Sequence, residues 1–298
     1  MAAARRELVF VGIRAGAVLG PVARKSTPLA REARMMGPRV VVPTLGRSPW
    51  LTETVASLGT VPGEVFFVTP TDAVAMAGPV PPKVVRVTDL GSGLYPALNA
   101  GFRAAGNWGI GTWINDDDRL VPGGFGQALA LLESRPDLAA VFGRVALIDQ
   151  AGRFLAAIPV ARSGDDLGPL LAAGVIPLAQ PGTLFRREVF DQLGGLDETL
   201  RLAGDMDFFG RALAAGFRFG FADAIVAEFR VHRGQLSQQA AVRVRETEAL
   251  FAAARATGVW RRGARAARWR FRWRNLGVYV GRIRRHGWVS MESLQAHE

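Results

Sequence analysis

The chain has no cysteine and only three histidines among its 298 residues. A disulfide framework, a thiolate nucleophile and a cysteine-ligated metal site are therefore excluded, and a site with several histidines is disfavoured. No run reaches the roughly 18 uninterrupted apolar residues that a membrane span needs, since Arg14 interrupts the nearest one, at 8–23. With 49% hydrophobic and 21% charged residues, the composition is that of a globular protein with a sizeable core.

Acidic residues are also absent from 255–285, where arginines alternate with Trp260, Trp269, Trp273 and other aromatic residues. Two interpretations stay open. Such a segment suits an anionic membrane surface, because indole rings lie at the headgroup level while guanidinium groups pair with phosphate. It also suits a solvated basic helix whose aromatic residues pack on the domain. Nucleic acid is not an expected partner, because no helix-turn-helix, zinc-finger or RNA-binding signature accompanies the charge.

The first part of the chain predicts a doubly wound α/β sheet flanked by helices. Short β-branched or apolar runs predict strands, and segments with helical spacing lie between them. A serine, Ser48, is expected to cap the first of these helices. Ligands of such sheets bind beyond the carboxyl ends of the strands. The expected strands are 39–43, 64–69, 83–87 and 110–114, and the expected helices are 49–58 and 95–105.

The second part is less regular. Expected elements are a helix at 123–134, strands at 139–147 and 154–158, and helices at 187–193 and from Asp205 to a cap at Gly216. We expect three regions in all. Residues 1–37 form an N-terminal extension, 38–240 form the α/β domain, and 241–298 form a basic, aromatic, helical C-terminal region.

Three consecutive carboxylates, Asp116, Asp117 and Asp118, follow the strand expected at 110–114. Adjacent negative charges repel, and each raises the pKa of the next. A divalent cation with oxygen ligands relieves that repulsion, often while also holding phosphates. The alternative is a solvated acidic turn. The position at the carboxyl end of a strand favours a ligand site over the turn.

Several segments, in their order and spacing, resemble the inverting family 2 glycosyltransferases, which have the GT-A nucleotide-sugar-binding fold. The resemblance covers roughly residues 38–240 and implies a mixed sheet of the GT-A type. The segments that carry it are 89–101 (DLGSGLYPALNAG), 115–118 (NDDD), 180–187 (QPGTLFRR), 194–198 (GGLDE), 203–208 (AGDMDF) and 229–232 (FRVH).

The resemblance implies a Mn²⁺ or Mg²⁺ cofactor and a set of site residues. Asp118 is the implied direct metal ligand, with Asp116 and His232 as further metal contacts; His232 has a structural role as its alternative. Asp205 is the implied catalytic base. Aspartate is also a favoured helix cap, so capping is the alternative role of Asp205.

The implied donor-binding residues come from several segments. Two departures from the family pattern concern them. The first is that the acidic residue usual after the second strand is missing. Either Asp72 takes its place, or the contact with the nucleotide base is lost. The tyrosine-aspartate pair of the family reads Tyr95-Pro96 here. The donor-binding set is Thr44, Arg47, Asp72, Asp89, Asn99, Asp116 and Asp117.

The resulting hypothesis is a metal-dependent inverting glycosyltransferase. It would transfer a sugar from a nucleotide-sugar, with a UDP-sugar favoured, to a glycan or lipid-linked acceptor in cell-surface polysaccharide or glycolipid synthesis. The expected location is cytoplasmic, peripheral at the inner membrane face. A sugar-1-phosphate nucleotidyltransferase is one alternative, although Pro43–Arg47 is short for the glycine-rich basic loop it needs. A non-catalytic basic membrane-binding module is the other, and the acidic residues at 116–118, 205 and 207 disfavour it.

Overall fold

The structure is a computed structural model that describes residues 37–59, 61–70, 84–86, 93–235 and 240–288. The predicted N-terminal extension lies outside the described residues except for Gly37, and so do two predicted donor contacts, Asp72 and Asp89. Nearly all of the predicted α/β domain and most of the C-terminal region fall inside the described ranges.

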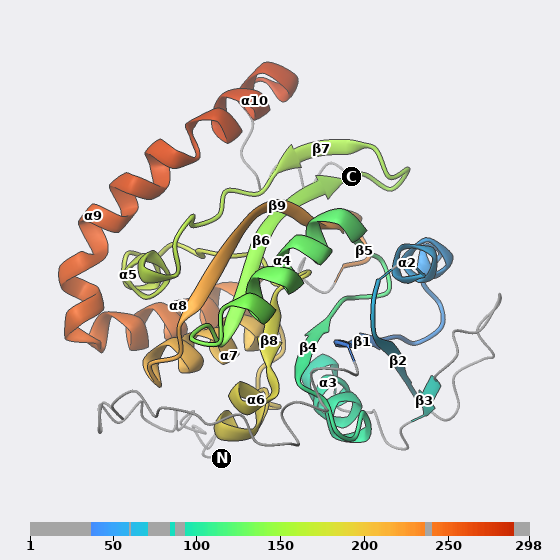
Figure 1. The fold of residues 1–298 in the computed structure, drawn as a ribbon. Helices are drawn as coiled ribbons and strands as arrows, with labels where there is room; N and C mark the ends of the chain where they lie inside the picture. Colours follow the sequence, from blue (N-terminus) through green and yellow to red (C-terminus); the bar gives the residue numbers. More distant parts are fainter. Residues whose placement is uncertain (1–36, 60, 71–83, 87–92, 236–239, 289–298) are drawn as a thin grey trace, which may run out of the picture.

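A mixed sheet of nine strands forms the centre of the described fold (Figure 1). Its strands follow the order β3-β2-β1-β4-β8-β6-β9-β5, and β7 pairs with β6 beside this path. The predicted class, an α/β fold with a mixed sheet flanked by helices, is confirmed. The strands are β1 (Arg39–Pro43), β2 (Glu64–Thr69), β3 (Val84–Arg86), β4 (Ile110–Trp113), β5 (Arg119–Leu120), β6 (Ala140–Ile148), β7 (Phe154–Ala157), β8 (Leu184–Arg186) and β9 (Phe219–Arg230).

The order of the first four strands creates a switch point between β1 and β4. Strands β1, β2 and β3 are parallel and run outward in one direction, after which the chain returns to place β4 on the other side of β1, again parallel. The loops that leave β1 and β4 therefore diverge at the carboxyl edge of the sheet. A crevice for a ligand opens at such a point in α/β sheets.

Helices cover both faces of the sheet, and the strands alternate accordingly. Val41 points into a core with α3 and the helices α5 to α9, while Val40 and Val42 point into a core with α2 and α4. The helices that precede the C-terminal region are α2 (Leu51–Leu58), α3 (Leu94–Ala104), α4 (Pro122–Ser134), the 3₁₀ turn η1 (Gly164–Asp166), α5 (Leu167–Ala172), α6 (Arg187–Leu193) and α7 (Gly204–Ala214).

The C-terminal region is helical, as predicted, and consists of α8 (Ala240–Ala256), α9 (Gly258–Arg274) and α10 (Leu276–His286). It is not a separate layer. Leu250 and Phe251 of α8 and Phe271 of α9 belong to the core that also contains α3 and α7. The Arg270 guanidinium of α9 pairs with buried Asp166 of η1. The first two C-terminal helices are therefore part of the domain's packing, which continues beyond the predicted boundary at residue 240.

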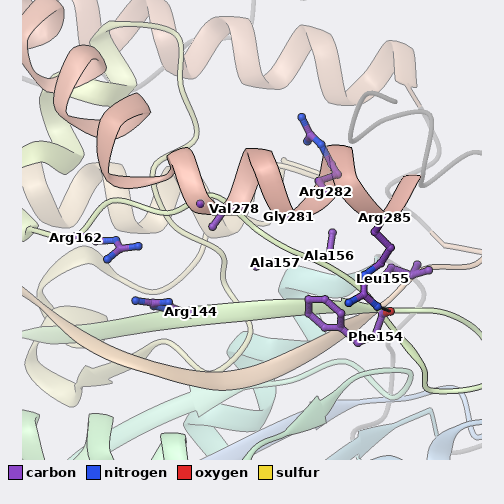
Figure 2. Close-up of a pocket in the computed structure, with 11 residues that line it drawn as sticks. Arg144, Phe154, Leu155, Ala156, Ala157, Arg162, Val278, Gly281, Arg282 and Arg285 are labelled. Carbon is purple, nitrogen blue, oxygen red and sulfur yellow. Dashed lines mark hydrogen bonds between the residues drawn. The ribbon is translucent and has the colours of Figure 1, made fainter. Parts of the chain in front are cut away.

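The last helix, α10, lies over β7 on the outside of the molecule (Figures 1 and 2). None of its residues is fully buried. Among the described helices, none combines the length and apolar character required to cross a membrane.

The element boundaries differ from the prediction at a few places. Helix α2 begins at Leu51, and Ser48 does not cap it in the usual way; its hydroxyl accepts from Trp50 N at 3.3 Å and donates to the Asp116 carbonyl at 2.8 Å. The short strand β8 and the twelve-residue strand β9 were not predicted. β9 shows no regular alternation of buried and exposed residues, because it twists and changes register along β6.

Candidate active site

The switch point brings Thr44, directly after β1, against Asp116, after β4. The Thr44 hydroxyl donates a short hydrogen bond to Asp116 Oδ2 and accepts one from Gly46 N at 2.9 Å. Burial raises the pKa of Asp116 to about 6, assisted by the neighbouring charge of Asp117 and opposed by the Thr44 hydrogen bond. Two predicted donor-binding residues from distant segments thus share one site.

Asp117 faces a histidine from the far end of the sheet. His232, just after β9, places Nε2 2.9 Å from Asp117 Oδ2, and the side chains keep 14% and 15% exposure, respectively. The other carboxylate oxygen, Oδ1, is buried and has no hydrogen-bond partner among the described residues. The Trp50 ring lies 4.5 Å from the imidazole and fixes its orientation. A carboxylate and an imidazole therefore share a small, partly open site.

Asp118 is more deeply buried than Asp116 and Asp117. Its side chain is fully buried, and Oδ1 accepts a hydrogen bond from Arg230 N at 2.9 Å. Burial, together with the Asp117 charge, raises the pKa of Asp118. A carboxylate anchored to β9 in this way holds residues 115–118, here called the acidic loop, in place. The other oxygen of Asp118, Oδ2, is buried and has no hydrogen-bond partner among the described residues, so the ligand role of Asp118 stays a prediction beside that of Asp117.

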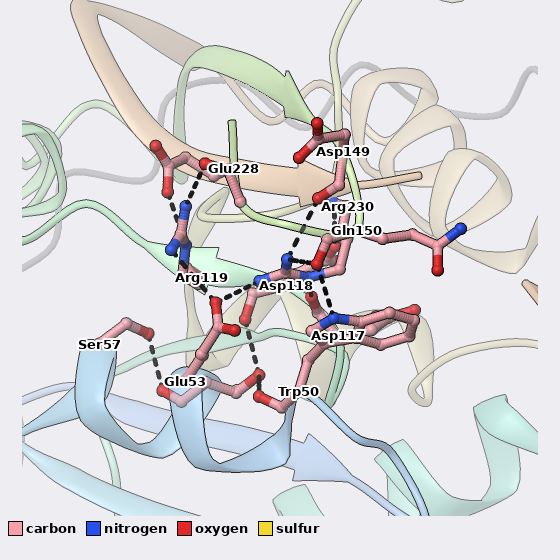
Figure 3. A network of polar contacts seen from close by, with 12 residues as sticks. Trp50, Glu53, Ser57, Asp117, Asp118, Arg119, Asp149, Gln150, Glu228 and Arg230 are labelled. Atoms are coloured by element: carbon pink, nitrogen blue, oxygen red, sulfur yellow. Dashed lines mark hydrogen bonds and ion pairs between the residues drawn. The ribbon is translucent and has the colours of Figure 1, made fainter. Parts of the chain in front are cut away.

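A fully buried arginine, Arg230, holds the acidic loop from behind (Figure 3). Its Nε donates to the Asp117 carbonyl at 2.9 Å, and Nη2 pairs with Glu53 Oε2 at 2.6 Å. Its Nη1 donates to the carbonyls of Asp149 and Gln150 at 3.1 and 2.9 Å. One side chain thus joins α2, the acidic loop and the β6–β7 turn. Buried charge is tolerated here because the guanidinium has a carboxylate partner and carbonyl acceptors.

Asp205 lies in the first turn of α7 and is partly exposed. Burial of its carboxyl group raises its pKa to about 6. The Tyr95 ring, at the start of α3, packs against Gly204, and burial together with the Asp205 charge raises the pKa of Tyr95. Helix α3 follows β3, so its start lies at the carboxyl edge of the sheet. Asp205 therefore lies at the same edge as the acidic loop.

The core supports the same placement of α7. The Phe209 ring stacks on Trp113 of β4 at a centroid distance of 5.9 Å and 12° between planes. Trp113 precedes the acidic loop by two residues, and its carbonyl accepts from Gln180 Nε2 at 2.8 Å. Asp205, one turn before Phe209, is held beside the end of β4.

Two predicted or considered residues have structural roles. Asn99, predicted to bind the donor, is 1% exposed; its Oδ1 accepts from Leu196 N and its Nδ2 donates to the Leu196 carbonyl, both at 2.9 Å. Its amide is thus bonded to the 194–198 loop, and the donor role of Asn99 stays a prediction. Asp207 pairs with Arg211 at 2.7 Å, and burial raises its pKa against the pull of that arginine.

The last donor-binding residue inside the described ranges, Arg47, is exposed on the loop after β1. That loop adjoins the switch point, so the donor role of Arg47 stays a prediction. Sequence reasoning missed Glu53 and Trp50, which support Arg230 and His232. The sequence around Glu53 and Trp50 predicts a helix. It does not indicate that Glu53 pairs with Arg230, which is 177 residues away.

The residues fit a divalent cation. Asp117 Oδ1 and Asp118 Oδ2 are buried oxygens without hydrogen-bond partners among the described residues, and an imidazole nitrogen lies beside them. Oxygen and imidazole donors suit Mn²⁺, and Mg²⁺ with more water. No group of three or more acidic, histidine or cysteine side chains in the described part of the chain forms a complete metal cage. A cation here would need ligands from phosphates or water.

No protein-family model matches the chain, and no curated protein sequence is significantly similar to it. Solved structures do match. Residues 1–349 of S. aureus TarS in complex with UDP-GlcNAc align with a TM-score of 0.51 and 16% identity, over 68% of this chain and 61% of that one. Another TarS 1–349 structure aligns at 0.49 and 16%, over 65% of this chain and 60% of that one. The chain thus matches about 60% of the length of these relatives, and the likeness shows a shared fold.

Proposed function

We propose that the chain is a glycosyltransferase that moves a sugar from a nucleotide-sugar, with a UDP-sugar favoured, to an acceptor hydroxyl. The observation that carries the proposal is the pair Asp117–His232 beside Thr44–Asp116 at the switch point of the sheet. Ligands of α/β sheets bind at this point. The fold shared with TarS, one structure of which holds UDP-GlcNAc, supports the choice of donor.

Asp205 is the proposed catalytic base. Inversion needs a base that takes the acceptor proton on the face opposite the leaving group. Burial raises the pKa of Asp205 to about 6, close to the value that suits proton transfer at neutral pH. Its carboxyl group lies at the same edge of the sheet as the acidic loop but belongs to helix α7, whereas the acidic loop follows strand β4. That separation would leave room for the sugar between the base and the donor phosphates.

Asp117 and His232 are the residues that would hold Mn²⁺ or Mg²⁺. A bound divalent cation stabilises the negative charge that develops on a departing diphosphate. The chain's own contribution is positional. Arg230 fixes the acidic loop, Trp50 orients the imidazole, and Thr44 orients Asp116 toward the same crevice, where it would bind donor hydroxyls. A preorganised site of this kind does not need to rearrange during the reaction.

The acceptor is proposed to be a glycan or a lipid-linked sugar, reached from a membrane surface. The outward face of α9 and α10 supports this. Trp269 and Trp273 are 63% and 60% exposed and lie four residues apart on α9, and Leu276 and Val280 of α10 are exposed as well. The buried residues Ala267 and Phe271 lie on the opposite side of α9. A helix face with exposed tryptophans beside many arginines suits an anionic membrane surface at the cytoplasmic side.

The two other hypotheses have less support. A sugar-1-phosphate nucleotidyltransferase would need a glycine-rich basic loop after β1, whereas this loop is occupied by the Thr44–Asp116 contact. A non-catalytic membrane module would have no use for a buried carboxyl group with a raised pKa at position 205.

A release assay tests the proposal. The protein is supplied with Mn²⁺ and a panel of UDP-, GDP- and dTDP-sugars, and free nucleotide is measured with and without candidate acceptors. We expect nucleotide release from a UDP-sugar, at a rate reduced 100-fold or more in Asp205→Asn. Equal release by the variant would remove Asp205 from the mechanism. No release from any nucleotide-sugar, in a protein that binds UDP, would overturn the proposed reaction.

A further inference from the structure

A pocket that none of the proposed active-site residues lines lies between α10 and β7 (Figure 2). Its volume is about 310 Å³, at the lower end of the range for small-molecule sites. Phe154, Leu155 and Ala156 of β7 form one wall, and Gly277 and Gly281 of α10 belong to the other.

The pocket is basic. Arg144, Arg162, Arg282 and Arg285 line it, and no acidic residue does so within the described chain. Among the described residues, Arg144 is the one of these four with a carboxylate partner, Asp223, at 2.6 Å. Arg285 instead lies over the Phe154 ring at 4.9 Å, as Figure 2 shows, and donates weakly to the Phe154 carbonyl at 3.4 Å. Guanidinium groups gathered without matching carboxylates repel one another unless an anion joins them.

Two exposed glycines, Gly277 and Gly281, lie on the α10 side of the pocket. A glycine inside a helix costs about 1 kcal/mol relative to alanine, so its presence needs a reason. A Cβ added at Gly277 or Gly281 would meet nothing within 4 Å, so close packing is not that reason. They lie four residues apart on the side of α10 that faces the pocket. Larger residues there would fill the space that the pocket leaves open.

From these observations we infer that the α10–β7 pocket binds a phosphate group carried on an apolar chain. Arginine forks bind phosphate oxygens with paired hydrogen bonds and are weakly hydrated, which suits a partly enclosed site. The apolar wall of Phe154, Leu155 and Ala156 would hold the chain. A phospholipid or another lipid phosphate has both parts; free inorganic phosphate has only the first. The inference does not depend on the proposed transferase activity.

Calorimetric titration of the full chain tests it with two probes, a short-chain phosphatidic acid below its micelle concentration and inorganic phosphate. Four variants are compared with the wild type: Arg285→Gln, Gly281→Leu, and the controls Arg284→Gln and Gly258→Ala. Arg284 is an exposed neighbour of Arg285 outside the pocket, and Gly258 is a helix glycine with open space around it. Thermal melting of each variant checks that it is folded.

We expect phosphatidic acid to bind, with roughly tenfold or greater weakening in Arg285→Gln and loss of binding in Gly281→Leu. Both controls should bind as the wild type does. Equal affinity for inorganic phosphate would overturn the role of the apolar chain and assign the site to a free anion. Binding of neither probe would overturn the inference. So would equal weakening by Arg284→Gln and Arg285→Gln, which would indicate attraction to the basic surface as a whole.

Discussion

The imidazole Nε2 of His232 lies 2.9 Å from the Asp117 carboxylate, joining the residue after β9 to the loop after β4. The two are 115 residues apart in sequence. Neighbouring Asp118 turns the other way, into the interior, where it accepts from Arg230 N. Asp117 thus contacts the imidazole while Asp118 contacts the β9 backbone, and substitutions at the two positions should have different effects.

Asp117→Asn should lose metal-dependent turnover by roughly 100-fold or more while the protein stays folded. The amide keeps the shape of the side chain but removes the charge that a cation needs. The measurement is nucleotide release against Mn²⁺ concentration, with thermal melting as the check on folding. An Asp117→Asn variant with the wild-type response to Mn²⁺ would contradict the ligand role.

Asp118→Asn should act mainly on stability. Its carboxylate is fully buried against the Arg230 backbone, and an amide would bury an N–H₂ group at the place of Oδ2, which has no hydrogen-bond partner among the described residues. We expect a loss of about 1–3 kcal/mol in the free energy of unfolding, measured with urea. Unchanged stability with abolished metal affinity would support Asp118 as the direct ligand.

Arg230→Met should destabilise the protein strongly. The substitution keeps much of the buried volume but leaves several carbonyls without their donor and leaves Glu53 with Arg119 as its remaining partner. Because Glu53 is 45% exposed, the larger cost comes from the carbonyls left unpaired in the interior, about 1–3 kcal/mol for each, and urea unfolding measures it. Arg119→Met is the control, since Arg119 also pairs with Glu53 but is 25% exposed. A loss for Arg230→Met no larger than for the control would show that the arginine does not organise the acidic loop.

Activity should depend on the ionisation of Asp205. A base works only when deprotonated, so kcat/KM should rise as pH increases through about 6 and level off above it. Asp205→Asn should remove that limb together with most of the activity. The free energy of unfolding should change in the opposite direction. Because burial raises the pKa of Asp205 in the folded protein, its carboxyl group contributes to stability below the ordinary aspartate pKa. That contribution is lost as pH rises through about 6. A profile that is flat across pH 5–7 would contradict the assignment.

Asn99→Ala should lower stability without changing donor affinity. The side chain forms two hydrogen bonds with the Leu196 backbone and a third to Glu198 at 2.8 Å, and the loop would lose all three. A loss of about 1–3 kcal/mol is expected in urea unfolding. Titration calorimetry with UDP measures the affinity of the folded variant. Weaker UDP binding at unchanged stability would instead support the predicted donor contact.

The sequence predicted the features that depend on local pattern. Strands β1 and β2 and helix α6 have the expected bounds, and the acidic residues do follow a strand at the carboxyl edge. Apolar runs bounded by proline or glycine identify such elements without knowledge of the rest of the fold.

The features that were missed depend on contacts between distant segments. Nothing in the local sequence around Arg230 indicates burial against Glu53, and nothing around Asn99 indicates its bonds to a loop nearly 100 residues away. In α9, Phe271 is buried while Trp269 and Trp273 are exposed, a division that the packing of α9 against α5 and α8 decides. The sequence alone left both interpretations of those aromatic residues open.

The most direct test of the account is the position of a bound cation. Crystals of the protein grown with Mn²⁺ and UDP would locate the metal by its anomalous scattering. We predict a single strong peak within coordination distance of Asp117 and His232, next to the diphosphate. A peak elsewhere, or UDP bound at full occupancy with no peak beside these two residues, would contradict the central claim.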